Sequence, residues 1–263
     1  MNARFDGWRP DKTWGWSLVV PDGIEWSGWL PGTGKRETLI ETEWQSIEPL
    51  QVVRLDKTHA ALVTVSSPVY ENGHTQCGYT CSYFIGVVFF KAHKGRWRET
   101  SHIDAAAWIV LYPGQTMVQK WEGHGHVFSA VTRGCWGGAC TQDVVLLGLQ
   151  PDRLLPLLYT SLNESNAGAE AFGSDELTCG DLLAPGWRQP PQEHFDPTLD
   201  CREAKGTWRL SGDQVVFSFL GHVRRADSQG RAKPIKTWSR KVTLGLRGDR
   251  LVPISGKLPE FGF

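Results

Sequence analysis

The sequence has no surplus of charge and no long apolar run. Lysine and arginine number 28, aspartate and glutamate also number 28, and the formal net charge at pH 7 is zero. A dedicated nucleic-acid-binding protein carries a basic surplus that displaces counterions from phosphates, so this balance argues against that class. No stretch approaches the roughly 18 consecutive apolar residues of a membrane-spanning helix. We therefore expect neither a nucleic-acid partner nor a transmembrane segment.

The chain also opens without a secretory leader. Its first eight residues read Met-Asn-Ala-Arg-Phe-Asp-Gly-Trp, with neither a basic start nor an apolar core. Two interpretations stay open: a mature form behind a new methionine, or a cytosolic protein with reduced thiols. The cysteine pattern favours the first, and with it a periplasmic or secreted location.

Recognisable catalytic motifs are missing as well. There is no His-Glu-x-x-His, no phosphate-binding glycine loop and no Gly-x-Ser-x-Gly. His124 and His126 are spaced to lie on one face of a strand, where two imidazoles can hold a metal. A third ligand would come from His102, Asp104 or Glu122. Ordinary hydrogen-bonded histidines in a turn and at a strand start are the simpler explanation, so we expect no catalytic residue, no metal and no cofactor.

What the sequence does contain is a repeat. Residues 145–157 and 242–254 share eight of thirteen positions without a gap. In both, alternating apolar residues lead into a tight turn and a second apolar run, which is the pattern of a β-hairpin. A looser copy spans residues 88–97. One supersecondary unit used several times indicates a repeat architecture.

Composition and repetition together predict an all-β fold. The 13 tryptophans, 29 glycines and 15 prolines fit a chain of strands and turns better than a helical one. We predict a single domain over residues 1–263, in which antiparallel hairpins form a small propeller-like or barrel-like structure, with a β-sandwich as the alternative. The approximate repeat units are 14–58, 59–104, 105–162 and 206–263, and an irregular excursion tied by a disulfide occupies 163–205.

Two shorter segments give further structural expectations. Residues 17–26 read as a strand, a Pro-Asp-Gly turn and a return strand. Residues 153–161 could pass for a short helix. The matching hairpin carries Pro253, which does not fit a helix interior, so we expect a strand.

The six cysteines fall into neighbouring pairs. An even count at local spacing predicts three disulfides and an oxidising compartment. Zinc is the alternative, but the spacing is looser than the usual two-residue knuckle, and the last pair would be left unexplained. In the chain-entropy model, the bond that closes the longest loop stabilises the fold by roughly 3 kcal/mol. The expected pairs are Cys77 with Cys81, Cys135 with Cys140, and Cys179 with Cys201.

Aromatic and acidic residues in loops are the candidate contact residues. Tyr79 and Trp136 lie inside the two short cysteine-closed loops, where rings can anchor a protein or stack on a sugar. Alternatively, Trp136 folds back over the edge of the sheet. The long excursion adds carboxylates that could serve in binding or form a glycosidase-type pair, although solvation explains them equally well. These carboxylates are Asp175, Glu176 and Asp181.

Charge is segregated along the second half of the chain. Between Glu164 and Glu203 there are nine acidic residues against two arginines, and between His222 and Lys241 seven basic residues against one aspartate. Such segments can steer an oppositely charged partner, or they can neutralise each other if they pack together.

These features predict a non-catalytic binding protein. The most specific form of this expectation is a secreted or periplasmic inhibitor or immunity protein that neutralises a toxin or hydrolase. A rigid, disulfide-braced sheet would present the loop aromatics and the acidic excursion to that protein. Two alternatives stay open: a carbohydrate- or cell-envelope-binding module, suggested by the tryptophan content, and a metal-dependent hydrolase that uses His124 and His126.

Overall fold

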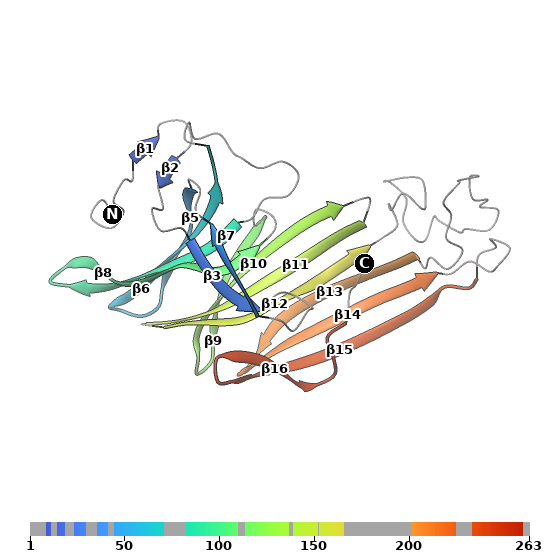
Figure 1. The fold of residues 1–263 in the computed structure, drawn as a ribbon. Coiled ribbons are helices and arrows are strands. Elements are labelled where there is room, and N and C mark those ends of the chain that lie inside the picture. Colours follow the sequence, from blue (N-terminus) through green and yellow to red (C-terminus); the bar gives the residue numbers. More distant parts are fainter. Residues whose placement is uncertain are drawn as a thin grey trace. The chain divides into compact units, whose positions relative to one another are not determined.

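A computed structural model shows an all-β chain (Figure 1), which confirms the predicted fold class. None of the described residues forms a helix that could cross a bilayer. Among the described residues, side chains are described from residue 45 onward, apart from Cys135, Trp136 and Ala139. The described residues are 9–11, 15–18, 24–29, 36–41, 45–70, 83–109, 114–136, 139–151, 153–165, 201–224 and 233–259.

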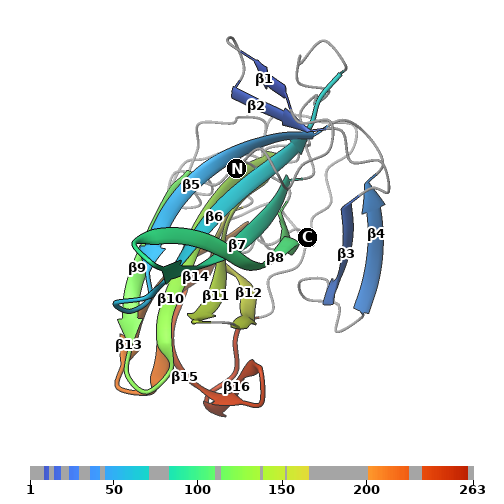
Figure 2. The same cartoon turned by 90° about the vertical axis from the view of Figure 1, so that its left-hand side faces the viewer.

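The first sheet is antiparallel throughout and has six strands. Figure 2 shows its β5, β6 and β7 running side by side. Its strand order is β1 (Arg9–Asp11), β2 (Gly15–Leu18), β5 (Gln45–Arg54), β6 (His59–Pro68), β7 (Tyr83–His93) and β8 (Arg96–Ile109). A separate two-stranded ribbon is formed by β3 (Ile24–Trp29) and β4 (Arg36–Glu41).

The second sheet has eight strands. Because both sheets have two edge strands, the described strands are compatible with the β-sandwich alternative, and propeller-like or barrel-like closure stays a prediction. The order is β16 (Arg250–Ser255), β15 (Lys236–Arg247), β14 (Gln214–Arg224), β13 (Cys201–Ser211), β12 (Arg153–Ser165), β11 (Ala139–Gln150), β10 (Gly125–Trp136) and β9 (Gln115–Trp121).

The two repeated segments are neighbouring strand pairs. β11 is followed by its neighbour β12, and β15 turns into its antiparallel partner β16. Gly248 in the second turn has a φ of +66°, a left-handed conformation that favours glycine. Residues 153–161 are a strand, as Pro253 in the matching hairpin indicated. β12 runs on to Ser165 and β13 begins at Cys201, so strands enter both ends of the excursion expected at 163–205.

The two strands expected within residues 17–26 appear as parts of β2 and β3, but their expected pairing with each other is wrong. β2 pairs with β1 and with β5, whereas β3 pairs with β4. A turn signal fixes only the local backbone. Strand pairing also depends on the side chains that meet across the ladder, and these come from residues distant in the sequence.

β8 is the edge strand of the first sheet and is irregular. Its ladder with β7 shifts register twice, between Ile85 and Val87 and between Phe89 and Phe90. A β-bulge of this kind bends the strand and increases its local twist. Residues 96–104 of β8 are exposed.

The chain divides into two compact units. Unit 1 comprises Met1–Thr132 and Val145–Tyr159, and unit 2 comprises Arg133–Val144 and Thr160–Phe263. The long strands β10, β11 and β12 contribute one end to each unit. The single domain expected from the sequence stays a prediction.

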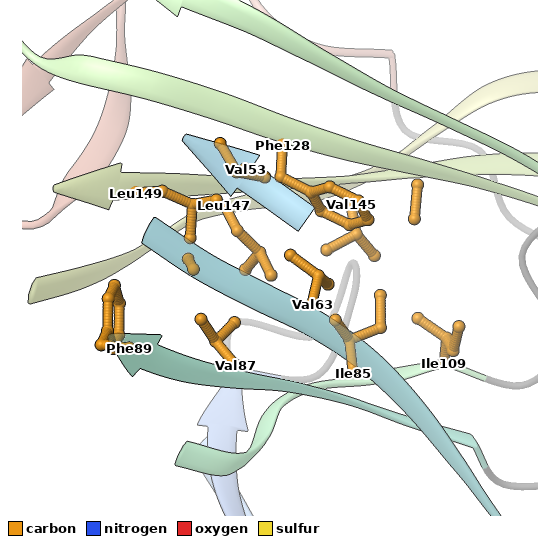
Figure 3. Close-up of a cluster of buried hydrophobic side chains, with 12 residues drawn as sticks. Val53, Val63, Ile85, Val87, Phe89, Ile109, Phe128, Val145, Leu147 and Leu149 are labelled. Carbon is orange, nitrogen blue, oxygen red and sulfur yellow. The ribbon is translucent and has the colours of Figure 1, made fainter. Parts of the chain in front are cut away.

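Unit 1 is held together by a core between two layers of strands (Figure 3). Alternate residues of each strand point into it, as expected for a sheet with one face buried. Burying one such side chain stabilises the fold by roughly 1.5–3 kcal/mol. The core residues are Val53, Ala61, Val63, Ile85, Val87, Phe89, Ile109, Phe128, Ala130, Val145, Leu147 and Leu149.

Unit 2 buries one face of β14 and β15. Phe217 pairs with Val242 across the ladder, and its ring lies 6.0 Å from the nearly parallel ring of Phe219. All three side chains are buried. On the opposite face, the paired residues Ser218 and Lys241 are polar and exposed. This one-sided burial fixes the register, because a shift of one residue would exchange the two faces.

Candidate binding site at one end of unit 2

Several strand ends meet at one end of unit 2, and they carry connections that the sequence singled out. The ladders pair Cys201 with Arg224, and Glu164 with Ala204. The ends of β12 and β14 therefore lie beside the beginning of β13 (Figure 1). The acidic segment 166–200 leaves and returns here, next to the strand end that leads into the basic segment. We call this set of strand ends the loop end of unit 2.

Side chains join three strands at the loop end. Ser161 Oγ on β12 donates a hydrogen bond to Asp143 Oδ1 on β11 at 2.6 Å. Asn163 Nδ2 donates to Gln142 Oε1, and Asn163 Oδ1 accepts a hydrogen bond from the backbone N–H of Gly206 at 2.9 Å. The Asn163 amide thus bridges β11 and β13 from the strand between them. These contacts also place the beginning of β11, and with it the short connection from β10, at the loop end.

A row of aligned residues crosses the four strands β12 to β15. Glu164 pairs with Ala204, Ala204 with Gly221, and Gly221 with Trp238. A Cβ atom on Gly221 would lie 2.3 Å from the indole, so the Trp238 ring occupies the space above this glycine. The guanidinium of Arg240 lies 5.7 Å from the ring centroid, within the range of a cation–π contact.

Glu164 is the buried titratable group of this row. Its residue is only 6% exposed. Burial raises the pKa of the Glu164 carboxyl to about 7, and the positive charge of Arg202 opposes part of that rise. A carboxyl group with this pKa is partly protonated at neutral pH, and its charge responds to small changes of pH.

A second acidic residue lies on the neighbouring position of β13. Glu203 is the cross-strand partner of His222, and its Oε2 lies 2.8 Å from His222 Nε2. Protonation of the imidazole would turn this contact into an ion pair. The loop end therefore carries two carboxyl groups at adjacent ladder positions, Glu164 on β12 and Glu203 opposite Ser165 on β13.

Two of the six cysteines predicted to form disulfides lie among the residues whose side chains are described. Cys140 at the start of β11 and Cys201 at the start of β13 are both disulfide-bonded. The other four cysteine side chains lie outside the described residues, so the pairings stay predictions. These four are Cys77, Cys81, Cys135 and Cys179.

The predicted contact residues are not placed. Trp136 is the last residue of β10, and its side chain lies outside the described part of the chain. Tyr79 falls in the connection between β6 and β7, also outside it. The three carboxylates of the acidic segment lie outside it too; they are Asp175, Glu176 and Asp181.

The histidine pair belongs to unit 1. His124 lies in the turn between β9 and β10, where its ring centroid is 4.4 Å from that of Trp121 and its backbone oxygen accepts a hydrogen bond from Gln150. His126 faces Lys120 across the ladder. Burial lowers the pKa of His126, and the nearby positive charge of Lys120 lowers it further. Among the described residues, no three His, Cys, Asp or Glu side chains are grouped to hold a metal ion.

A carboxylate–histidine contact at the turn between β5 and β6 is a turn motif. Asp56 Oδ2 lies 2.8 Å from His59 Nδ1. The Oδ1 atom of Asp56 accepts hydrogen bonds from the backbone N–H groups of Thr58 at 2.6 Å and His59 at 2.8 Å. The Thr58 and His59 donors hold the pKa of Asp56 well below its usual range. Bonds from an aspartate to the backbone two and three residues ahead close a turn, which accounts for the geometry.

Sequence reasoning missed the row from Glu164 to Trp238 and the Asn163 bridge. Gly206 and Gly221 carried a partial signal, since a glycine inside a strand often marks a close approach of another group. Which group approaches depends on the registers of three ladders, and these are not readable from one strand.

Comparisons with protein-family models, with curated proteins and with solved structures find no match for this chain.

Proposed function

We propose that the chain is a non-catalytic protein-binding protein, of the inhibitor or immunity type, that neutralises a toxin or hydrolase through the loop end of unit 2. The observation that carries the proposal is the pairing of Cys201 with Arg224. Together with the pairing of Ser165 with Glu203, it places both ends of the acidic segment beside the strand end that leads into the basic one. A partner that docks here meets both signs of charge at one place.

The build of the loop end supports a binding role. The Asn163 bridge and the disulfide bonds of Cys140 and Cys201 restrain the strand ends from which the connections leave. A restrained surface loses less conformational entropy when a partner binds. Charged groups around such a surface raise the association rate and discourage partners of the wrong charge.

The same disulfide bonds support a periplasmic or secreted location. Disulfides persist in oxidising compartments and are rare where glutathione and thioredoxin keep thiols reduced. An inhibitor of a secreted hydrolase, or an immunity protein against a toxin that enters the periplasm, would act in such a compartment.

Site-specific photocrosslinking in the cells that make the protein tests the proposal. The crosslinking residue replaces Trp136 or Asp175, and the control replaces Asp213, which lies in the turn between β13 and β14 at the opposite end of those strands. We expect one protein to be crosslinked from the first two positions and not from the control. That protein, once purified, should lose its activity at a one-to-one ratio with the chain.

Two results would contradict the proposal. One is a partner captured from position 213 but from neither position at the loop end. The other is a captured enzyme whose activity is unchanged when the chain saturates it. Charge-neutralising changes at Asp175, Glu176 and Asp181 provide a second readout: we expect slower association, with a smaller dependence of the rate on salt than in the unchanged protein.

A further inference from the structure

β15 is longer than the strand beside it. β16 pairs with β15 only over Thr243–Arg247, whereas β14 pairs with β15 from Lys236 to Gly245. The chain after β16 continues a short way along the same side, since a Cβ on Gly256 would lie 2.5 Å from the Lys241 carbonyl oxygen. Arg240 Nη1 donates a hydrogen bond to the Lys257 carbonyl oxygen at 3.4 Å.

Residues 236–239 of β15 are left with one side uncovered by any described strand. We call this segment the open edge of β15. On this side, backbone N–H and C=O groups point outward in alternation, and another extended chain can pair with them. The ladder with β14 is regular here, so the edge is straight enough to continue the sheet.

The residues of β15 around the open edge are basic and would attract a negatively charged segment. Residues 233–247 contain no acidic residue. Lys236 lies in one row with Arg202 of β13 through Val223 of β14, and the next row joins Thr237 to Glu203 through His222. The described part of unit 2 carries twelve Lys or Arg residues and five Asp or Glu residues. The cations beside the open edge are Lys233, Lys236, Arg240 and Lys241.

The edge also offers apolar contacts. Trp238 is half-buried over Gly221, with Lys236 and Arg240 two residues away on the same face of the strand. Ile235, just before the strand, is 41% exposed. An added strand would thus meet an aromatic ring between two cations, an arrangement that suits a segment with alternating acidic and apolar side chains.

We propose that the open edge of β15 binds an acidic, extended peptide segment of a partner protein by strand addition. A second copy of this chain is a poor occupant, because two such edges would place lysines and arginines against one another, and like charges across a ladder are destabilising. The inference goes beyond the proposed function: it does not require the acidic segment 166–200, nor that the partner be a toxin or hydrolase.

Titration of the full-length protein with synthetic peptides tests the inference. The probe is an eight-residue peptide of alternating glutamate and valine. One control has the same residues with every second backbone amide N-methylated, and a second has lysine in place of glutamate. N-methylation on one edge removes the strand hydrogen bonds and keeps the charge. We expect the acidic peptide to bind, the N-methylated one to bind at least about tenfold more weakly, and the lysine peptide not to bind, by fluorescence anisotropy.

A charge reversal on the protein gives an independent readout. Lys236→Glu should weaken binding of the acidic peptide by about tenfold, which corresponds to about 1.4 kcal/mol. Arg209→Glu, the control, reverses an exposed positive charge on β13 whose row runs through Val216 to Thr243, away from the open edge. Amide signals of residues 236–240 should shift on binding in NMR spectra.

Four results would overturn the inference. The first is that the acidic peptide fails to bind at millimolar concentration. The second is that the N-methylated peptide binds as well as its parent, which would show attraction by charge alone, and the third is that Arg209→Glu weakens binding as much as Lys236→Glu. The fourth is that the free protein forms dimers that Lys236→Glu dissociates, which would show that a second copy occupies the edge. None of these results bears on crosslinking from positions 136 and 175, so the two proposals fail separately.

Discussion

The indole of Trp238 lies over Gly221, so close that a Cβ atom on the glycine would lie 2.3 Å from the nearest ring carbon. The two residues are cross-strand partners on β15 and β14. The ring takes its position because its partner has no side chain.

Gly221→Ala should therefore destabilise unit 2. Because the added methyl group would overlap a rigid ring, we expect the free energy of unfolding to fall by about 1–3 kcal/mol. Chemical denaturation at pH 7 measures the change. In a Trp238→Ala background the same substitution should cost much less, since the ring is gone. An equal cost in both backgrounds would show that the ring is not what excludes a side chain at position 221.

Glu164 should make stability depend on pH. Its pKa of about 7 in the folded protein exceeds the ordinary value of 4.5, so the folded state binds more protons than the unfolded state between these values. The free energy of unfolding should therefore fall as pH rises from about 4.5 to about 7. Glu164→Gln should flatten this part of the profile, while Asp249→Asn in an exposed turn should leave it unchanged. A profile that Glu164→Gln does not alter would contradict the pKa assignment.

Asp56 should stabilise the protein more at neutral pH than at acidic pH, which is the opposite of the pH dependence expected from Glu164. Its pKa is depressed in the folded protein, so its contribution is present above the ordinary value of 3.8 and is lost as pH falls below it. Asp56→Ala removes the acceptor for the N–H groups of Thr58 and His59 and should lower the melting temperature at pH 7. Asp56→Asn keeps an acceptor oxygen and should lower it less. Equal effects of the two changes would show that charge, rather than hydrogen bonding, closes this turn.

The disulfide bonds should contribute strongly to stability. Thiol titration of the denatured, unreduced protein should find no free thiol at Cys140 or Cys201, and peptide mapping should join them to Cys135 and Cys179. Removing a native disulfide typically costs 2–5 kcal/mol. Cys201→Ala should therefore lower the denaturation midpoint markedly in the oxidised protein, with little further effect after reduction. If the mapped bonds join other cysteines, the predicted pairing is wrong, although Cys140 and Cys201 are still disulfide-bonded.

Local patterns predicted much of the fold. Alternating patterns in the sequence predict strands at residues 207–210, 214–220, 236–246 and 251–254, and all four appear; β13 begins well before its pattern, at Cys201. In each, alternation of apolar and polar side chains fixes both the strand and its buried face. The strand expected over residues 153–161 appears for the same reason.

Pairing between distant segments could not be predicted in the same way. β2 pairs with β5 although a Pro-Asp-Gly turn signal at residues 21–23 lies shortly after it in the sequence. The pKa of the Glu164 carboxyl is raised because the group is buried, at a position aligned with Ala204 and Gly221 of two other strands. In the sequence, Glu164 is one of nine acidic residues between positions 164 and 203, and no local pattern indicates that it is buried. Long-range register, rather than local propensity, decides which of them is desolvated.

The two sheets limit edge-to-edge association in different ways. The edge strand β8 of the first sheet is bulged, whereas the open edge of β15 in the second sheet is straight. Interruptions at Ile85–Val87 and Phe89–Phe90 leave β8 without the even spacing of amides that a neighbouring molecule would need to align with it. β15 keeps that spacing and relies on its lysines and arginines to hold identical molecules apart. Two copies should thus not pair through this edge at neutral pH, and acetylation of Lys236 and Lys241 should make that pairing less unfavourable.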